Sequence, residues 1–252
     1  MVLLKALITG ASSGIGKEMA LYLSSLNYEV ILVSRDKEAL EKMQDSFSSK
    51  VKIIVMDLSN IQKVKELYVI CKNDDIDILI NNAGFGDYGS FYNTDLLNDI
   101  DMINLNIQAV HVLTKLFLRD MIKRDSGYIL NVASFAAFQP GPMMVTYYGT
   151  KVYVYSLTEA IYEELRHKKS NVHISCLCPG PINTNFNDVA NVKFKIKQLS
   201  SSYVARFAIN KMFSNKMLII PGFKMKVLKF LERFVSDKFL LKMTYHMQKK
   251  KK

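Results

Sequence analysis

Three side chains in the middle of the chain could carry out acid/base chemistry together: Ser134, Tyr147 and Lys151. Tyr147 and Lys151 are at positions i and i+4, a spacing that places both on one face of a helix. A phenol with a pKa near ~10 is a poor acid or base at neutral pH, but an adjacent ammonium stabilises the phenolate and lowers that pKa. A serine hydroxyl can then hold a carbonyl oxygen while hydride reaches the carbon. The spacing therefore indicates interconversion of a ketone and a secondary alcohol.

A glycine-rich turn follows the first predicted strand, in the segment Thr9-Gly10-Ala11-Ser12-Ser13-Gly14-Ile15-Gly16. Such a turn lets backbone N–H groups and a helix N-terminus approach a pyrophosphate. The spacing G-x-x-x-G-x-G departs from the G-x-G-x-x-G dinucleotide fingerprint, and glycine clusters after strands are also ordinary tight turns. Taken alone, the segment indicates either a dinucleotide site or a structural turn.

The end of the second predicted strand, Ser34-Arg35-Asp36, bears on which dinucleotide would fit. An NAD-binding fold usually places an acid there to bond the ribose 2′-hydroxyl. A hydroxyl followed by a guanidinium instead suits a 2′-phosphate, which a carboxylate would repel. Asp36 is better explained as the N-cap of the next helix. We therefore expect NADP(H) rather than NAD(H).

Short β-branched runs alternate with helical patterns along the chain, which indicates parallel strands joined by right-handed crossovers. The predicted fold class is α/β, a Rossmann-type doubly wound parallel sheet in a single domain over residues 1–222, followed by a basic helical extension over 223–252. Ligands of such sheets bind beyond the carboxyl ends of the strands. The predicted strands are 6–8, 29–33, 51–56, 76–80, 128–132, 172–178 and 217–220, and the predicted helices are near 15–26, from 36, 62–71, near 98–122, and 147–167.

In their order and spacing these motifs resemble the short-chain dehydrogenase/reductase family, from Leu3 to about Gly222. The pattern from the strands to the tail also resembles a bacterial subgroup related to long-chain 3-oxoacyl reductases and hydroxysteroid dehydrogenases. The matching pieces are Thr9-Gly-x3-Gly-Ile-Gly16, Asp57-Leu58, Asn81-Asn82-Ala83-Gly84, Asn106, Ser134, Tyr147-x3-Lys151 and Pro179-Gly180-Pro181-Ile182-x-Thr184.

The resemblance implies a role for each matching residue. Asp57 and Leu58 would contact the adenine, Asn82 the adenosine ribose, and Ile182 and Thr184 the carboxamide. Asn106 would bend its helix and hold a water that links Lys151 to solvent; Asn104 competes for this role, but the family spacing favours Asn106. The implied catalytic residues are Asn106, Ser134, Tyr147 and Lys151, and the expected cofactor-binding residues are Gly10, Ser12, Ser13, Ile15, Arg35, Asp57, Leu58, Asn82, Tyr147, Lys151, Ile182 and Thr184.

Composition limits the remaining classes. The net charge of +11 is concentrated at one end, because residues 193–252 carry +14 and residues 1–192 carry −3, so the body of the protein is not a nucleic-acid-binding surface. The four histidines have no metal-ligand spacing, and the three cysteines are too few for a disulfide framework. No export signal and no spanning helix are predicted, and we expect a cytoplasmic protein with reduced thiols.

The basic extension from Lys224 predicts an amphipathic helix. Its apolar face would comprise Val227, Leu228, Leu231, Phe234 and Val235. Such a helix could pack over the substrate cleft, pack against a partner subunit of a dimeric or tetrameric homo-oligomer, or lie on the inner face of an anionic membrane with Lys249–Lys252 as an anchor.

Segments 85–93, 135–144 and 186–194 are rich in Phe, Tyr and Met, which favours a lipophilic ketone. A fatty 3-oxoacyl thioester and a steroid-like ketone both fit this pattern. The alternative from a different class is a catalytically silent NADPH-binding regulator or membrane-surface adaptor. Degraded catalytic residues would be its signature, whereas the four implied catalytic residues are intact here.

Overall fold

The computed structural model describes residues 4–184, 186 and 198–249. Within them a seven-stranded sheet has the order β3-β2-β1-β4-β5-β6-β9, and every neighbouring pair is parallel. A separate pair of short strands, β7 (Ile182–Asn183) and β8 (Leu199–Ser200), lies beyond it. The strands of the main sheet are β1 (Lys5–Thr9), β2 (Glu29–Ser34), β3 (Val51–Val55), β4 (Ile78–Asn81), β5 (Gly127–Val132), β6 (Val172–Leu177) and β9 (Leu218–Ile219).

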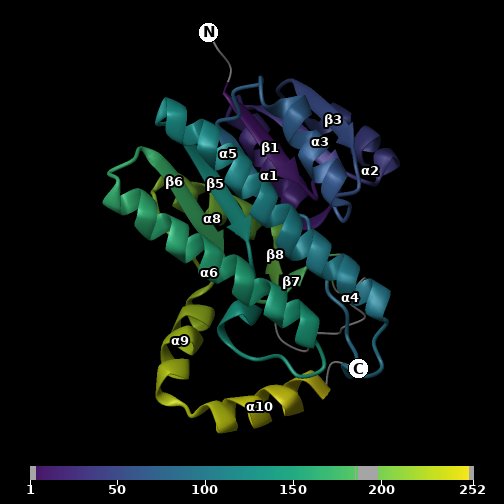
Figure 1. Ribbon diagram of the computed structural model, residues 1–252, viewed down its shortest axis with the longest axis vertical. Coiled ribbons are helices and arrows are strands. Elements are labelled where there is room, and N and C mark those ends of the chain that lie inside the picture. The colour runs from purple at the N-terminus through teal and green to yellow at the C-terminus, as the bar shows by residue number, and fades with distance from the viewer. Residues whose placement is uncertain (1–3, 185, 187–197, 250–252) are drawn as a thin grey trace.

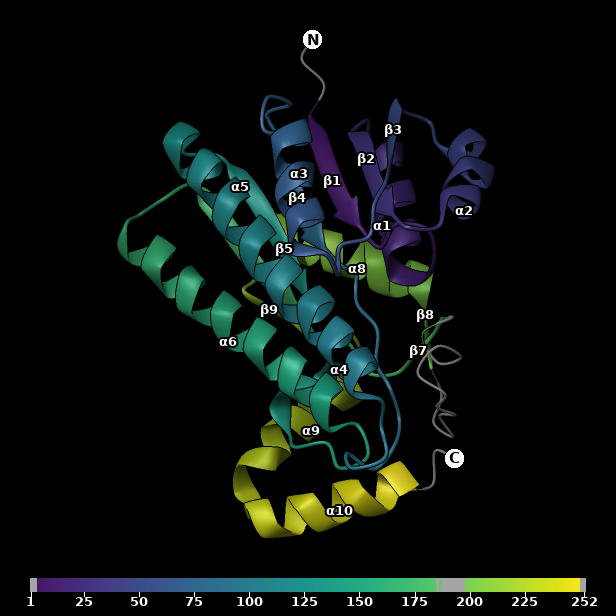
Figure 2. The same cartoon turned by 45° about the vertical axis from the view of Figure 1, so that its right-hand side comes forward.

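Helices cover both faces of the sheet (Figures 1 and 2). Because parallel strands are connected by crossovers, the central strands are shielded on both faces, and every residue of β4 is buried. In β1, Ala6 and Ile8 pack toward α1 and α8, whereas Leu7 packs toward α3 and α5, and all three are fully buried. The helices are α1 (Gly14–Ser25), α2 (Lys37–Lys42), α3 (Ile61–Cys71), α4 (Leu96–Ile103), α5 (Val110–Arg124), α6 (Val145–His167), α8 (Ser201–Phe213), α9 (Phe223–Leu231) and α10 (Asp237–Lys249).

The doubly wound fold confirms the predicted class, but two helical regions differ from the prediction. The single helix predicted near 98–122 is α4 and α5, joined by a π-helical turn at Asn104–Ala109. Helix α8 was not predicted at all, although Ser200 caps it by accepting from the Tyr203 N–H at 3.3 Å. It buries one face against α1 and completes the core on that side.

The basic extension forms two helices, so the prediction of one continuous apolar face through Val235 was wrong. Helix α9 ends at Leu231, a 3-10 turn follows at Glu232–Phe234, and α10 begins at Asp237. Val235 is extended, and the Ser236 carbonyl accepts from the N–H groups of Phe239 and Leu240. A Ser-Asp pair is a strong helix start, which explains the new helix. Lys250–Lys252 lie outside the described residues.

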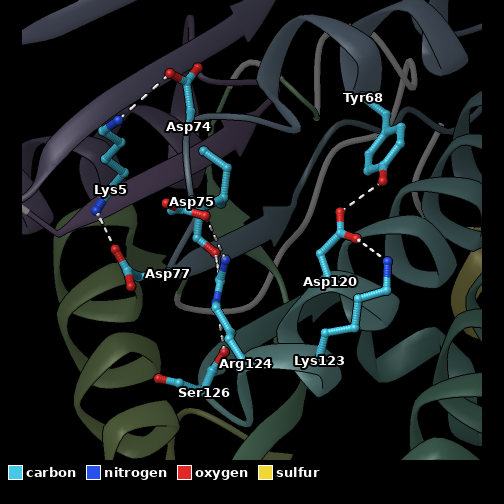
Figure 3. A network of polar contacts seen from close by, with 10 residues as sticks. Lys5, Tyr68, Asp74, Asp75, Asp77, Asp120, Lys123, Arg124 and Ser126 are labelled. Atoms are coloured by element: carbon cyan, nitrogen blue, oxygen red, sulfur yellow. Dashed lines mark hydrogen bonds and ion pairs between the residues drawn. The ribbon is translucent and has the colours of Figure 1, made fainter.

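Charged side chains join the amino-terminal ends of the strands, at the edge opposite the motifs (Figure 3). The Lys5 backbone N–H donates to Asp77 at 2.8 Å, and Asp74 accepts from Lys52 at 2.9 Å. On the neighbouring helices the Tyr68 hydroxyl donates to Asp120 at 2.7 Å. Burial opposes ionisation of Asp74, but hydrogen bonding and charge from Lys52 and Lys5 bring its pKa below the usual value. This edge is therefore a structural network, separated from the motifs by the length of the strands.

Candidate active site

A cavity of about 500 Å³ lies beyond the carboxyl ends of the strands. It collects residues from the glycine turn, the ends of β2, β3, β4 and β5, the start of α6, and the segments α9 and α10. Every residue predicted to bind the cofactor lines this cavity, and so do three of the four predicted catalytic residues: Gly10, Ser12, Ser13, Ile15, Arg35, Asp57, Leu58, Asn82, Ser134, Tyr147, Lys151, Ile182 and Thr184. Asn106 is fully buried behind the wall.

The glycine turn has the close approaches that exclude larger residues. Gly10 has φ +64°, and a Cβ there would lie 2.8 Å from the Cα of Ala83. A Cβ on Gly16 would lie 2.4 Å from both the Asn82 Nδ2 and the Gly10 carbonyl oxygen. The turn thus packs directly on the end of β4, and α1 starts beside the cavity with its first N–H groups free to meet an anion.

Asn82 and Thr9 hold that turn in place. The Asn82 side chain donates to the carbonyl oxygens of Thr9 and Gly10, both at 3.0 Å. In return the Thr9 hydroxyl accepts from the N–H groups of Asn82 and Ala83 at 3.0 Å. Asn82 therefore links β1 to β4 in addition to lining the cavity. The sequence motif contains Thr9, but sequence reasoning assigned it no role.

The end of β2 presents a hydroxyl and a guanidinium beside the turn. The Ser34 hydroxyl donates to the Ser12 oxygen at 2.9 Å. Arg35 is exposed and makes no ion pair with any described residue. The carboxylate of Asp36 accepts from the Ala39 N–H at 3.0 Å and caps α2, as predicted. The one acid at this position is thereby engaged in the helix cap.

The remaining predicted cofactor residues lie around the same end of the cavity. One carboxylate oxygen of Asp57 accepts from the N–H and the hydroxyl of Ser59, each at 2.9 Å, while Leu58 is buried. Thr184 packs against the glycine turn, since a Cβ on Gly14 would lie 3.2 Å from its methyl carbon. Ile182 begins β7 and is buried.

Ser134, Tyr147 and Lys151 converge at the centre of the cavity. Ser134 follows β5 and caps a 3-10 turn by accepting from the Ala136 N–H at 3.1 Å. Tyr147 and Lys151 both project from the first turns of α6, as the spacing predicted, and both are buried. The Lys151 ammonium donates to the Val132 carbonyl at 3.0 Å and lies 5.8 Å from the centroid of the Tyr147 ring.

The pKa values of this pair correct one expectation. In the protein alone, burial raises the pKa of Tyr147 above its usual value, and a hydrogen bond with Ser134 offsets only part of this. Burial also lowers the pKa of Lys151 to about 8. In the chain without cofactor, burial therefore shifts the pKa of Tyr147 in the direction opposite to the predicted lowering. Near neutral pH, Tyr147 is a protonated acid and Lys151 is an ammonium.

Asn106 lies in the π-helical turn, where the resemblance implies a bend. Its Oδ1 accepts from the Phe85 N–H at 3.1 Å, and its Nδ2 donates to the Phe85 carbonyl at 2.8 Å and to the Thr150 hydroxyl at 3.1 Å. It thus fastens the segment after β4 to the turn of α6 that carries Lys151. The competing Asn104 accepts from Gln108 at 2.8 Å, away from the cavity lining.

Sequence reasoning missed a buried polar network behind the site. The Asn81 amide donates to Thr114 at 3.0 Å and to Asn131 at 2.8 Å, and Asn131 donates to Thr158 at 3.0 Å. These four side chains connect β4, β5, α5 and α6. Asn81 belongs to the recognised Asn-Asn-Ala-Gly motif. Asn131 could have revealed the network, because it is a polar residue within an apolar strand and a buried amide needs hydrogen-bond partners.

The far half of the cavity is formed by apolar side chains and by the C-terminal helices. Figure 1 shows α9 and α10 (yellow) at the end of the molecule opposite the N-terminus. Of the three predicted placements of the extension, the structure shows packing over the cleft. The side chains that line this half are Phe85, Phe135, Met144, Tyr148, Phe186, Met225, Leu228, Thr244, Met247 and Gln248, with Gln139 beside them.

The family model for short chain dehydrogenases matches residues 4–193. The chain belongs to this family. Among curated relatives, a hydroxysteroid dehydrogenase-like protein 1 of Gallus gallus is 35% identical over 201 residues, which is 75% of this chain and 59% of that protein. A very-long-chain 3-oxoacyl-CoA reductase of Phaeosphaeria nodorum is 36% identical over 182 residues, 68% of this chain and 53% of that protein. The chain thus spans little more than half the length of these relatives.

Solved structures of family members have the same fold. A short-chain dehydrogenase from Sphingobium yanoikuyae in complex with NADPH has a TM-score of 0.83 and 25% identity, covering 92% of this chain and 94% of its own. A family member from Burkholderia phymatum in complex with NAD has a TM-score of 0.84 and 24% identity, covering 92% and 93%. The family therefore includes members solved with either dinucleotide.

Proposed function

We propose that the protein is an NADP(H)-dependent oxidoreductase that transfers hydride between nicotinamide and a ketone or secondary alcohol. The observation that carries the proposal is the meeting of Ser134, Tyr147 and Lys151 in one cavity with the glycine turn. This arrangement provides a proton donor, a carbonyl-holding hydroxyl and a dinucleotide cradle together. Membership of the family supports the same reaction class.

In the direction of reduction, the chain's own residues manage the carbonyl oxygen. Bound reduced nicotinamide supplies the hydride. Ser134 donates a hydrogen bond to the carbonyl oxygen, and Tyr147, held protonated by burial, donates its proton to that oxygen as charge develops. The Lys151 ammonium then stabilises the phenolate that forms when Tyr147 has given up its proton. Asn106 is a positioning residue, because it holds the turn that carries Lys151.

The residues at the adenosine end favour NADP(H) within this proposal. Arg35 is exposed at the cavity edge, with Ser34 and Ser12 beside it, while Asp36 is held in the α2 cap. A guanidinium without an ionic partner among the described residues suits a 2′-phosphate. Arg35→Ala is expected to weaken NADPH binding by about tenfold or more while leaving NADH binding within about twofold. Equal losses for both cofactors would contradict the preference.

The far half of the cavity supports a lipophilic substrate. Its walls are mostly Phe, Met and Leu side chains, and the relatives named above include a 3-oxoacyl-CoA reductase and a hydroxysteroid dehydrogenase-like protein. Apolar walls favour a ligand whose surface is mainly hydrocarbon. We therefore infer a fatty 3-oxoacyl or steroid-like ketone.

The test is the consumption of reduced nicotinamide by wild type and by Tyr147→Phe, with panels of 3-oxoacyl thioesters, steroid ketones and simple ketones. The variant should lose at least about a thousandfold in kcat and retain its NADPH affinity, because only the proton donor is removed. Tyr153→Phe is the matched control: it lies on the same helix, outside the cavity, where its hydroxyl meets His111 at 2.6 Å. Unchanged turnover in Tyr147→Phe would refute the assignment. Tight NADPH binding without turnover of any ketone would instead support the silent regulator.

Contact with an anionic membrane is a second candidate role for α9 and α10. The phenylalanines Phe223, Phe230, Phe234 and Phe239 are more than half exposed. Lysines and one arginine lie among them, which is the composition of an interfacial helix. No helix in the described part of the chain is long and apolar enough to cross a membrane. Homo-oligomerisation stays a prediction.

Sedimentation with vesicles tests this contact on the full chain. Wild type should bind vesicles that contain anionic lipid, and Phe230→Ser with Phe234→Ser should bind several-fold less, because the apolar anchor is removed. A matched variant is Leu96→Ser with Leu97→Ser, which removes two exposed leucines of α4 instead. Equal binding by wild type and the variant of Phe230 and Phe234 would refute the proposed membrane contact.

A further inference from the structure

We propose that Gln248, with Tyr148, is a specificity-determining pair that binds a second, neutral polar group of the substrate, away from the reacting carbonyl. The chemical group that fits is a hydroxyl. This inference rests on the proposed oxidoreductase function and adds a requirement on the substrate: a lipophilic ketone that carries an additional hydroxyl group.

Gln248 reaches the substrate half from the last turns of α10. Its side chain lines the cavity, and the residue is only 1% exposed. Leu240, Thr244 and Gln248 form the buried face of α10. The Tyr88 hydroxyl donates to the Gln248 backbone carbonyl at 3.1 Å, and the Thr244 hydroxyl donates to Gln139 at 3.4 Å. These contacts hold α10 against the cleft and do not use the side-chain amide of Gln248.

The Gln248 amide is only half satisfied. Its Nε2 donates to the Tyr148 hydroxyl. Its Oε1 is buried and has no hydrogen-bond partner among the described residues. A buried polar atom without a partner costs about 1–3 kcal/mol. Because Gln248 is one of the residues that line the cavity, a substrate group that supplied the missing partner would recover this cost.

The pair suits a group that can either donate or accept a hydrogen bond. In the orientation described, Oε1 accepts from the ligand; with the amide turned over, Tyr148 donates to Oε1 and Nε2 donates to the ligand. A hydroxyl satisfies either arrangement. A charged group does not fit, because the only charged residues among the described cavity lining are Arg35, Asp57 and Lys151, all at the cofactor end or the reaction centre.

The pair lies next to the proposed proton donor. Tyr148 is adjacent to the proposed acid, and the rings of Tyr147 and Tyr148 meet edge to face with centroids 6.0 Å apart. Tyr148 cannot move away freely, because it packs on Gly141, where a Cβ would lie 2.1 Å from its ring. A substrate held by Tyr147 at its ketone and by Gln248 at its hydroxyl is therefore fixed at two points, which sets its orientation.

A matched substrate series tests the proposal. The probes are 2-alkanones of increasing chain length and the same ketones with a terminal hydroxyl, together with a steroid monoketone with and without a second hydroxyl. Wild type should prefer one hydroxylated probe over its parent by about tenfold in kcat/KM, as expected for one buried hydrogen bond. Gln248→Leu should lower kcat/KM for the hydroxylated probe about tenfold more than kcat/KM for its parent ketone, so that the preference disappears. Lys242→Gln, on the exposed side of α10, should retain the preference.

A structural role for Gln248 gives a different result. If the residue only held α10 in place, Gln248→Leu would lower kcat/KM for parent and hydroxylated probes equally, and this outcome would overturn the proposal. So would a wild type without hydroxyl preference in either series, even though turnover of the parents would leave the proposed reaction intact.

Binding measurements decide the matter if turnover is absent. Calorimetry with the NADP⁺ complex compares alkanediols and steroid diols with the corresponding monoalcohols. The wild type should bind one diol about tenfold more tightly than its monoalcohol, and Gln248→Leu should bind the two equally. Equal affinity in the wild type would refute the hydroxyl site independently of any catalytic result.

Discussion

Gly149 lies between Tyr147 and Lys151 on α6, and replacing it with alanine should stabilise the protein. Glycine in a helix interior costs about 1 kcal/mol relative to alanine, because the unfolded chain loses more freedom when it folds. At this position nothing opposes the gain: Gly149 is exposed, and a Cβ there would meet no atom within 4 Å. The full benefit of about 1 kcal/mol should therefore appear in the free energy of unfolding.

The size of the thermal shift follows from the length of the chain. With about 2.1 cal/mol/K of unfolding entropy per residue, the 252 residues give roughly 0.5 kcal/mol/K at the melting temperature. A stabilisation of about 1 kcal/mol then raises Tm by about 2 °C. Because no contact of Tyr147 or Lys151 changes, NADPH affinity and kcat/KM should stay within about twofold.

Differential scanning calorimetry of wild type, Gly149→Ala and Gly16→Ala provides the assay. Gly16 also lies in a helix, but its Cβ would stand 2.4 Å from the Asn82 amide nitrogen. The same substitution there should lower stability by about 1–3 kcal/mol and weaken NADPH binding, because the glycine turn must shift. A Tm of Gly149→Ala equal to or below that of wild type would refute the reasoning about the open Cβ position.

Three further outcomes are expected. Burial lowers the pKa of Lys151 to about 8, so its charge is lost as pH rises through that value; NADPH affinity measured by fluorescence should fall above pH about 8 in wild type and stay level in Lys151→Met. Thr114→Val removes the hydroxyl that hydrogen-bonds with both Asn81 and Asn131, so it should lower the free energy of unfolding measured in urea by about 1–3 kcal/mol. The same substitution at an exposed threonine should change that free energy negligibly. The pKa of Asp74 is lowered, so the stability it contributes is present above about pH 4 and lost as pH falls through its folded pKa; the difference in unfolding free energy between wild type and Asp74→Asn should shrink between pH 6 and pH 3.

Much of the fold could be predicted from sequence because the signals were local. Apolar runs such as Glu29–Ser34 alternate with helical periods, and this alternation leaves a doubly wound sheet as the natural arrangement. Helix α8 was missed although the signal was present, because its buried residues recur at helical spacing and pack in the core beside α1: Val204, Ala205, Ala208, Ile209 and Met212. The end of α9 at Leu231 was not predicted, because a continuous apolar stripe in the sequence does not show which of its residues pack against another element.

The residues of the candidate site could be predicted from the sequence. The direction of the pKa shift of Tyr147 and the side chains that form the substrate half of the cavity could not. The spacing of Tyr147 and Lys151 fixes their shared helix face, since this is a property of the helix alone. The raised pKa of Tyr147 depends on how deeply the ring is buried by segments distant in sequence, including Phe186 at 5.3 Å between ring centroids. The approach of Gln248 to Tyr148 joins residues a hundred positions apart, and periodicity carries no information about such a contact.

The division of the cavity between the strand ends and the C-terminal helices has an evolutionary consequence. The cofactor half is built from turns that the sheet itself fixes, whereas α9 and α10 join that sheet through a single connection after β9. We therefore expect that residues 223–249 can be exchanged between homologues as a unit while the dinucleotide cradle is kept. Chimeras that swap this unit should inherit the substrate range of the donor and the coenzyme preference of the recipient.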